Sequence, residues 1–272
     1  MNRGQGALEY LLLIGGAVTV AAIVVVLVIG IGGSGGDTSE KATYSVEEKK
    51  QDTIYGFHLP GGVSMSGLLG FYKFEEGSGT TAANSLKGGT SATLVNSPLW
   101  QSSPSCKSGS CLLFNGVSTY VQIPGPLSFS TVHGPSTVAM WINPTTLVGL
   151  KRMFSDNCSE MGLWHNGTTA AGTAYATPPG VNIATGQWAH VAVTHDHPTD
   201  LTNTVIKFYL NGQLIGQATR TITTENGYTD APFFIGADTC TAGTNFDGAI
   251  DEVILYNRAL TDAEINRIYS GS

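Results

Sequence analysis

The chain has 272 residues, of which 12% are charged and 35 are glycine, and its formal net charge at neutral pH is −7. This composition is typical of a turn-rich, all-β exported domain and argues against a helical cytosolic enzyme. The negative charge is spread without acidic blocks, and the sequence contains no basic patch or arginine-rich helix, so nucleic acid is not an expected partner.

An uncharged apolar run over residues 11–31 is the first element along the chain. As a helix it is roughly 31 Å long, which matches the thickness of a bilayer core. A cleaved secretory signal fits poorly, because the run is long and ends in "GIGGSGG" rather than in a small-residue cleavage site. A plain transmembrane anchor gives no reason for Glu9, since a carboxylate in hydrocarbon costs about 2.5 kcal/mol or more.

The stretch "RGQGALEYLLLIGGA" resembles the class III signal peptide of archaeal type IV pilin-like proteins. The resemblance implies that a prepilin peptidase cuts between Gly4 and Gln5, which makes residues 1–4 a leader and residues 5–31 a hydrophobic pilin-type helix. Glu9 would then neutralise the new α-ammonium group of Gln5 on a neighbouring pilin subunit, because an unpaired buried charge costs several kcal/mol. The precursor would lie in the cell membrane and the mature chain in an extracellular filament at the cell surface.

Residues 32–65 are predicted to form a glycine-rich and polar linker. The stretch "GIGGSGGDTSE" ends the apolar helix and gives the chain a flexible exit. Residues 41–51 are polar and charged and have no apolar face of any width, so we expect residues 37–65 to form a solvated stalk that is partly helical.

A pattern of short alternating runs begins at residue 66, as in "STYVQIP", "STVAMWINP" and "WAHVAVTHD". It predicts an antiparallel β-sandwich, or jelly roll, over residues 66–272. The stretch "YLNGQL" predicts a hairpin with a type I′ turn at Asn211-Gly212. Near the end, "LTDAEINRIYSG" predicts a short helix that begins with a capping box between Thr261 and Glu264. The expected fold is therefore mainly β, with a hydrophobic N-terminal helix and a short C-terminal helix.

The four cysteines are predicted to form disulfides, because the domain is expected outside the cell. None lies in a CxxC pair or beside histidines at ligand spacing, which argues against zinc. Three pairings are open, and the most economical joins Cys106 to Cys111 and Cys158 to Cys240. The alternative is four buried free thiols.

Several stretches resemble laminin-G-like, concanavalin A-type jelly rolls, and they occur in that family's order. They are "LLGFYKFEEGSGTTAANS", "CLLFNGVSTYVQIP", "STVAMWINP", "GQWAHVAVTHD", "IKFYLNGQLIG" and "FDGAIDEVILYNRALTDAEINRIY". The resemblance implies a module that binds glycans or proteins, often in adhesion. Fold alone does not establish the ligand.

Many members of that family carry a calcium ion, so the resemblance implies one structural calcium site here. Its candidate ligands are Glu75, Asn84 and Ser85 in the first turn, and Asp247 and Asp251 on the C-terminal strand. Such oxygen ligands on loops and strand ends suit calcium. Asn84 stands where many relatives have aspartate, which would weaken the affinity.

The sequence does not predict an enzyme. A glycosidase needs two carboxylates that face one cleft. The pairs Glu75-Glu76 and Asp251-Glu252 are adjacent, so on regular strands their side chains would face opposite ways. The sequence also lacks the G-x-S-x-G, H-E-x-x-H and phosphate-loop motifs.

For ligand binding, the stretch "SEMGLWHNG" is the best candidate, because Trp164 and His165 precede an Asn-Gly turn. Aromatic faces pack on sugars, and loops on a rigid sandwich are where such sites lie. Trp100 is a second candidate, and for both tryptophans the alternative is a place in the core. Asn157 and Asn166 are glycosylation sequons, and a glycan on Asn166 would argue against Trp164 as a binding platform.

Together these features predict a pilin-like subunit of a type IV pilus-like filament that displays a lectin-like domain for adhesion to glycans or surface proteins. One alternative is a structural major pilin without a ligand. Another is an uncleaved, membrane-anchored binding protein that keeps residues 1–4. The glycine-rich tether favours the adhesin, because a repeating coat subunit gains from a rigid connection.

Overall fold

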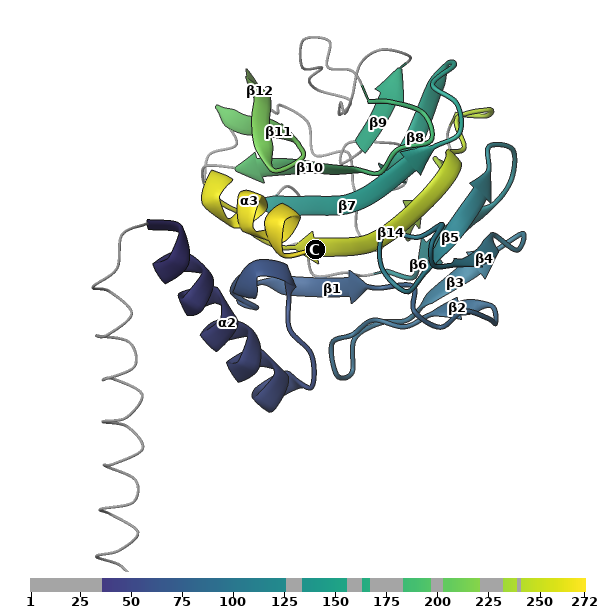
Figure 1. Ribbon diagram of the computed structural model, residues 1–272. Helices are drawn as coiled ribbons and strands as arrows, with labels where there is room; N and C mark the ends of the chain where they lie inside the picture. Colours follow the sequence, from purple (N-terminus) through teal and green to yellow (C-terminus); the bar gives the residue numbers. More distant parts are fainter. Residues whose placement is uncertain are drawn as a thin grey trace, which may run out of the picture. The chain divides into compact units, whose positions relative to one another are not determined.

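The chain divides into two units, Met1–Glu47 and Glu48–Ser272, and the second contains the β-sandwich (Figure 1). The computed structural model describes residues 36–125, 134–155, 163–166, 183–196, 203–220, 232–238 and 241–272. Within these ranges, no helix is both long enough and apolar enough to cross a membrane. The predictions for the leader, the Gly4-Gln5 cleavage pair, Glu9 and the apolar helix concern residues outside these ranges.

The sandwich consists of two antiparallel sheets, as predicted. Sheet A has the strand order β12–β11–β10–β7–β14–β5–β4, and β1 and β5 share one edge of the long strand β14. Figure 1 shows β7 and β14 side by side through the middle of this sheet. Its strands are β1 (Leu68–Tyr72), β4 (Leu99–Ser102), β5 (Ser110–Asn115), β7 (Ser136–Pro144), β10 (Ala189–Asp196), β11 (Thr204–Leu210), β12 (Gln213–Arg220) and β14 (Asp247–Tyr256).

Sheet B packs on sheet A and has the strand order β2–β3–β6–β13–β8–β9. Its strands are β2 (Thr81–Ala82), β3 (Ala92–Val95), β6 (Tyr120–Ile123), β8 (Leu150–Ser155), β9 (Leu163–Asn166) and β13 (Phe233–Ile235).

The main core lies between the two sheets. Side chains alternate along a strand, so Val138, Met140 and Ile142 of β7 all enter this core, where they meet Phe154 and Ile235 of sheet B. Burying each such side chain stabilises the fold by roughly 1.5–3 kcal/mol. The positions between them, such as Trp141, face away from sheet B. We call that side the outer face of sheet A.

The helix α3 (Asp262–Gly271) covers part of the outer face of sheet A. Its Ile265 and Ile268 are buried in a second core with outer-face residues of β7, β10 and β14. The predicted capping box is confirmed: the Glu264 amide donates to the Thr261 hydroxyl, and the Thr261 amide donates to the Glu264 carboxylate.

The predicted linker differs from the structure in its last part. The helix α2 (Gly36–Tyr55) agrees with the partly helical stalk, and a short 3-10 helix, η1 (Pro60–Gly62), follows it. The Gln51 carboxamide accepts a hydrogen bond from the Leu59 amide at 2.8 Å and donates one to the Val63 carbonyl at 2.7 Å. Leu59 and Val63 are fully buried in the core beneath α3. This part of the chain therefore belongs to the sandwich and is not solvated.

The β11–β12 hairpin confirms the predicted type I′ turn. Asn211 and Gly212 have φ angles of 49° and 75°, and this turn type requires both to be positive. Asn211 also fixes the neighbouring strand, because its side-chain oxygen accepts a hydrogen bond from the His190 amide at 2.9 Å.

Candidate functional site

A row of three side chains crosses the outer face of sheet A beside α3. Trp141 on β7 pairs with His190 on β10 and with Asp251 on β14. Paired residues on neighbouring strands lie on the same face. The Trp141 ring also lies 5.4 Å from the His190 ring and 5.5 Å from the Tyr269 ring of α3, centre to centre. The aromatic packing under α3 thus continues into a buried polar row.

A disulfide loop covers this row. The predicted bond between Cys106 and Cys111 is present and closes the loop "CKSGSC". Lys107 at its tip places Nζ 3.9 Å from the centre of the Trp141 ring, within the range of a cation–π contact. Its Nζ also donates a hydrogen bond to the Ser272 carbonyl.

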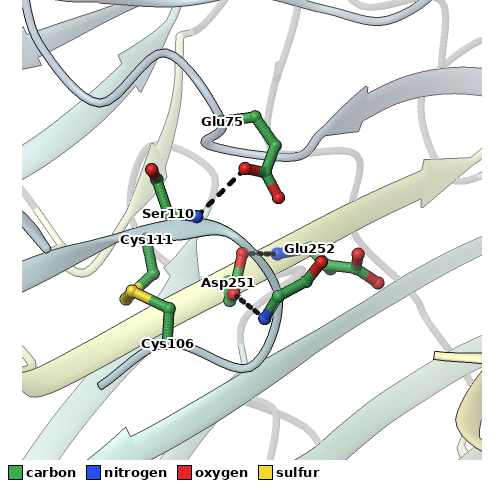
Figure 2. The surroundings of a disulfide bond; sticks show 7 residues. Glu75, Cys106, Ser110, Cys111, Asp251 and Glu252 are labelled. Carbon is green, nitrogen blue, oxygen red and sulfur yellow. Dashed lines mark hydrogen bonds between the residues drawn. A yellow bond between two sulfur atoms is a disulfide. The ribbon is translucent and has the colours of Figure 1, made fainter. Parts of the chain in front are cut away.

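Two carboxylates contact the loop from different sides, with Glu75 above it and Asp251 below it in the view of Figure 2. The Ser108 amide donates to Asp251 Oδ2 at 3.1 Å, and the Ser110 amide donates to Glu75 Oε2 at 3.0 Å. The acidic side chains thereby serve as acceptors for loop amides.

Burial raises the pKa of Asp251 to about 8, and the neighbouring charges of Glu252 and Glu75 raise it further, against the two amides that hydrogen-bond to it. Burial likewise raises the pKa of Glu252, against the attraction of Lys73. Within the described part of the chain, Glu252 Oε2 has no hydrogen-bond partner. Strand β14 is irregular here, because Glu252 has a positive φ angle and the pairing register shifts after Asp251. The Asp251 and Glu252 carboxylates are both buried, and the charge of Glu75 raises the pKa of each. The expectation that the Asp251 and Glu252 side chains face opposite ways holds for a regular strand and therefore does not apply to this pair.

The imidazole ring of His190 is uncharged at neutral pH. Its side chain is 1% exposed, and burial, followed by repulsion from Lys107, lowers its pKa to about 3. Its Nδ1 atom has no hydrogen-bond partner among the residues that the structure describes.

The predicted calcium ligands do not come together into a metal site. Glu75 and Asp251 accept hydrogen bonds from the disulfide loop. Asp247 lies four residues earlier on β14, with its side chain against Gly116. In the ranges that the structure describes, no group of three acidic, histidine or cysteine side chains is arranged to hold a metal ion.

Asn84 has a structural part in the first turn. Its Oδ1 accepts hydrogen bonds from the Phe71 and Leu86 amides, and its Nδ2 donates to the Leu69 carbonyl. Ser85 donates its backbone amide to the Phe71 carbonyl. The asparagine oxygen is thus already used to fix the turn against β1, so the residues present do not fit the calcium site that the resemblance implies.

Of the predicted sugar-binding aromatics, Trp100 packs against the main core and donates its indole N–H to the Gly79 carbonyl at 3.0 Å. Its side chain is only partly buried, so Trp100 stays a candidate for ligand binding. Trp164, His165 and Asn166 lie on β9, which pairs with β8, and the structure does not describe their side chains. Cys158, Cys240 and Asn157, for which a disulfide and a glycosylation site were predicted, lie outside the residues that the structure describes.

A groove of about 420 Å³ opens on the outer face of sheet A next to the disulfide loop. Gln101 and Leu113 reach it from the β4–β5 hairpin, Asn143 from the end of β7, Thr185 from the turn before β10, and Ala249 from β14. The remaining lining residues are Ser105, Pro144, Thr145 and Gly186.

No sequence motif marks this groove, because its residues come from the β4–β5 hairpin, the end of β7, the turn before β10, and β14. Each is an ordinary strand-end or turn residue when considered alone. Only the strand pairing brings them together: Ala249 of β14 pairs with Leu113 of β5 on one side and with Asn143 of β7 on the other.

Comparisons with solved structures identify the same fold in carbohydrate-active proteins. Domain 4 of an extracellular arabinanase from Geobacillus stearothermophilus, solved in complex with arabinotriose, is 21% identical with a TM-score of 0.58, and the match covers 74% of this chain and 98% of that domain. A Trypanosoma rangeli sialidase mutant displaying trans-sialidase activity is 18% identical with a TM-score of 0.61, and the match covers 84% of this chain and 38% of the sialidase.

The binding domain of Paraclostridial Mosquitocidal Protein 1 is 12% identical with a TM-score of 0.56, with 75% of this chain and 52% of that chain covered. At sequence identities this low, the similarity shows a shared fold and nothing more. No curated protein matches the chain significantly.

Two family models match the sequence in separate regions. Residues 2–29 match the class III signal peptide, as the first resemblance predicted. Residues 115–266, more than half of the chain, match the concanavalin A-like lectin/glucanases superfamily. With its two antiparallel sheets and this match, the chain belongs to the concanavalin A-like lectin/glucanases superfamily and carries a class III signal peptide at its N-terminus.

Proposed function

We propose that this chain is a pilin-like subunit that displays a glycan-binding domain on an extracellular filament and uses it for adhesion. The proposal rests on one observation: the same chain has a class III signal peptide and a concanavalin A-like domain. The signal peptide supports export and surface display. The lectin-like fold supports carbohydrate as the class of ligand.

In this proposal, a prepilin peptidase removes residues 1–4 while the precursor lies in the membrane. The apolar segment over residues 5–31 then packs among the corresponding helices of other subunits. Glu9 neutralises the new ammonium group of Gln5 on a neighbour, because an uncompensated charge in an apolar bundle costs several kcal/mol. This pairing would fix the axial register of the subunits.

We propose binding and not catalysis for the sandwich. The carboxylate with the most perturbed pKa, Asp251, is fully buried, and each of its oxygens accepts a backbone hydrogen bond. A sugar in solution has no access to it while the disulfide loop is in place. The arabinanase domain bound to arabinotriose supports a carbohydrate ligand for this fold, by analogy.

A structural pilin is a second candidate, and the packed end of the linker favours it. Residues 48–65 belong to the sandwich unit, where Gln51 fastens the segment that contains Leu59 and Val63. The linker between the apolar segment and the sandwich is therefore shorter than the sequence suggested, which suits the rigid connection of a coat subunit.

A deletion experiment separates the two candidates. Filaments are sheared from cells with and without the gene and labelled with antibodies against the sandwich. The adhesin predicts sparse labelling, intact filaments after deletion, and loss of attachment to glycan-coated surfaces. Dense labelling along the filaments and loss of filaments after deletion would instead support the structural pilin, whereas label confined to membranes would overturn both.

A further inference from the structure

We infer that the groove beside the disulfide loop is the glycan site and that it takes a neutral, hydroxyl-rich sugar. The inference rests on the proposed function and deepens it by naming the place and the chemical class of ligand. The groove lies on the outer face of sheet A, where Asn143 follows Trp141 by two residues on β7 and Ala249 precedes Asp251 by two residues on β14.

The polar lining of the groove matches sugar hydroxyl groups. A hydroxyl both donates and accepts hydrogen bonds, and so do the carboxamides of Gln101 and Asn143 and the hydroxyls of Thr145 and Thr185. Within the described part of the chain, no hydrogen bond uses these four side chains. They are therefore available to a ligand without breaking any bond of the fold.

The floor of the groove is apolar and suits the C–H face of a sugar ring. Leu113, Pro144 and Ala249 line it, and Trp188 packs with Leu113 against the cluster formed by Ala249 and the disulfide. A concave site with an apolar floor and a few polar groups that fix orientation is the usual form of a small-molecule site, and about 420 Å³ is within the usual range of roughly 300–1,000 Å³.

The absence of charge in the lining selects against acidic sugars. None of the residues described around the groove carries a charged side chain. A sialic or uronic acid would need an arginine or lysine to pair with its carboxylate. Lys107, the cation of the adjoining loop, is held over Trp141 and hydrogen-bonded to Ser272, while Glu75, which accepts a hydrogen bond from that loop, is acidic.

The base of the groove is rigid before a ligand arrives. Leu113, Ala249 and Asn143 occupy paired positions on three neighbouring strands, so the ladder of β5, β14 and β7 fixes their spacing. A site on strands loses less freedom on binding than a site on loops, which favours affinity.

The test is an array of neutral and acidic oligosaccharides, probed with the full chain in detergent. The neutral members include arabinotriose, maltotriose and cellotriose, and the acidic members include sialyllactose and oligogalacturonate. The strongest neutral binder is then titrated calorimetrically. We expect neutral glycans to bind and the Gln101→Ala/Asn143→Ala double variant to lose about tenfold or more in affinity, since it removes two hydrogen-bonding side chains.

Gln217→Ala is the matched control. Gln217 is an exposed glutamine on β12, an edge strand of sheet A at the opposite side from β4, which carries Gln101. The control should bind as the wild type does, and thermal unfolding should show that all variants are folded. A second variant, Thr185→Trp, fills the groove without removing a buried group and should also abolish binding.

Each other outcome has a distinct meaning. A preference for acidic glycans would overturn the inferred ligand class, and neutral binding unaffected by the double variant and by Thr185→Trp would overturn the groove as the site. In both cases the proposed adhesin would stand. Failure to bind any glycan on the array would overturn this inference together with the glycan-binding part of the proposed function, while the filament experiment would still decide assembly.

Discussion

The Nζ atom of Lys107 lies 3.9 Å from the centre of the Trp141 ring, so the disulfide loop is fastened over the buried row of sheet A by a cation as well as by a covalent bond. The ammonium group faces the negative face of the indole ring. This contact holds the loop between the polar row and the groove beside it.

Replacing Lys107 with methionine should weaken this attachment. Lys107→Met keeps an unbranched side chain of similar length but removes the charge, so we expect a loss of about 0.5–2 kcal/mol in the free energy of unfolding, measured with denaturant. Lys87→Met is the control, because Lys87 is exposed. Equal effects of the two substitutions would mean that the contact with Trp141 contributes nothing to stability.

Asp251 predicts a fall in stability with rising pH. Its pKa is about 8 in the folded protein and about 3.8 when free, so between these values the native state binds the additional proton. The contribution of Asp251 to stability is then fully present below about pH 4 and is lost as the pH rises through about 8. Asp251→Asn should flatten this fall in urea titrations at stepped pH.

The matched control for that titration is Asp247→Asn, on the same strand. It should leave the slope between pH 4 and pH 8 as in the wild type. If Asp251→Asn also leaves the slope unchanged, the carboxylate is charged in the folded protein and the described burial does not act on it.

His190 predicts a loss of stability in acid. Its pKa is about 3 in the folded protein against 6.5 when free, so between these values the unfolded state binds the additional proton. The contribution of His190 to stability is present above about pH 6.5 and is lost as the pH falls towards 3. His190→Gln should reduce this acid loss in the same urea titrations, and an unchanged acid limb would contradict the burial of a neutral imidazole.

The two hydrogen bonds of the Gln51 carboxamide should hold the segment before β1 in place. Gln51→Ala leaves the buried Leu59 amide and Val63 carbonyl without their partner, which costs about 1–3 kcal/mol for each unsatisfied group. We expect faster hydrogen exchange at the Leu59 amide and lower overall stability. Lys49→Ala, on an exposed position of the same helix, is the control, and equal exchange in both variants would show that the carboxamide does not anchor the segment.

Features with a local cause could be predicted from the sequence. The Asn211-Gly212 turn, the capping box at Thr261 and the bond between Cys106 and Cys111 depend on residues close together in the chain. The alternation in "STVAMWINP" likewise predicted strand β7, since one face of the strand enters the core.

Features set by tertiary context could not be predicted. Leu59 and Val63 stand in a glycine- and proline-containing segment without periodicity, and only the surface beneath α3 explains their burial. The irregularity at Glu252 breaks the alternation that the sequence implies. The groove depends on the register that aligns Leu113, Ala249 and Asn143, and no single stretch of sequence encodes that register.

The most direct test of the account is the identity of the chain's first residue in sheared extracellular filaments. Quantitative mass spectrometry of filament and membrane fractions would detect it. We predict a filament peptide that begins at Gln5, which would establish cleavage after Gly4 and assembly in one measurement. A peptide that begins at Met1 and occurs only in membranes would contradict the pilin-like account and leave Glu9 without a role.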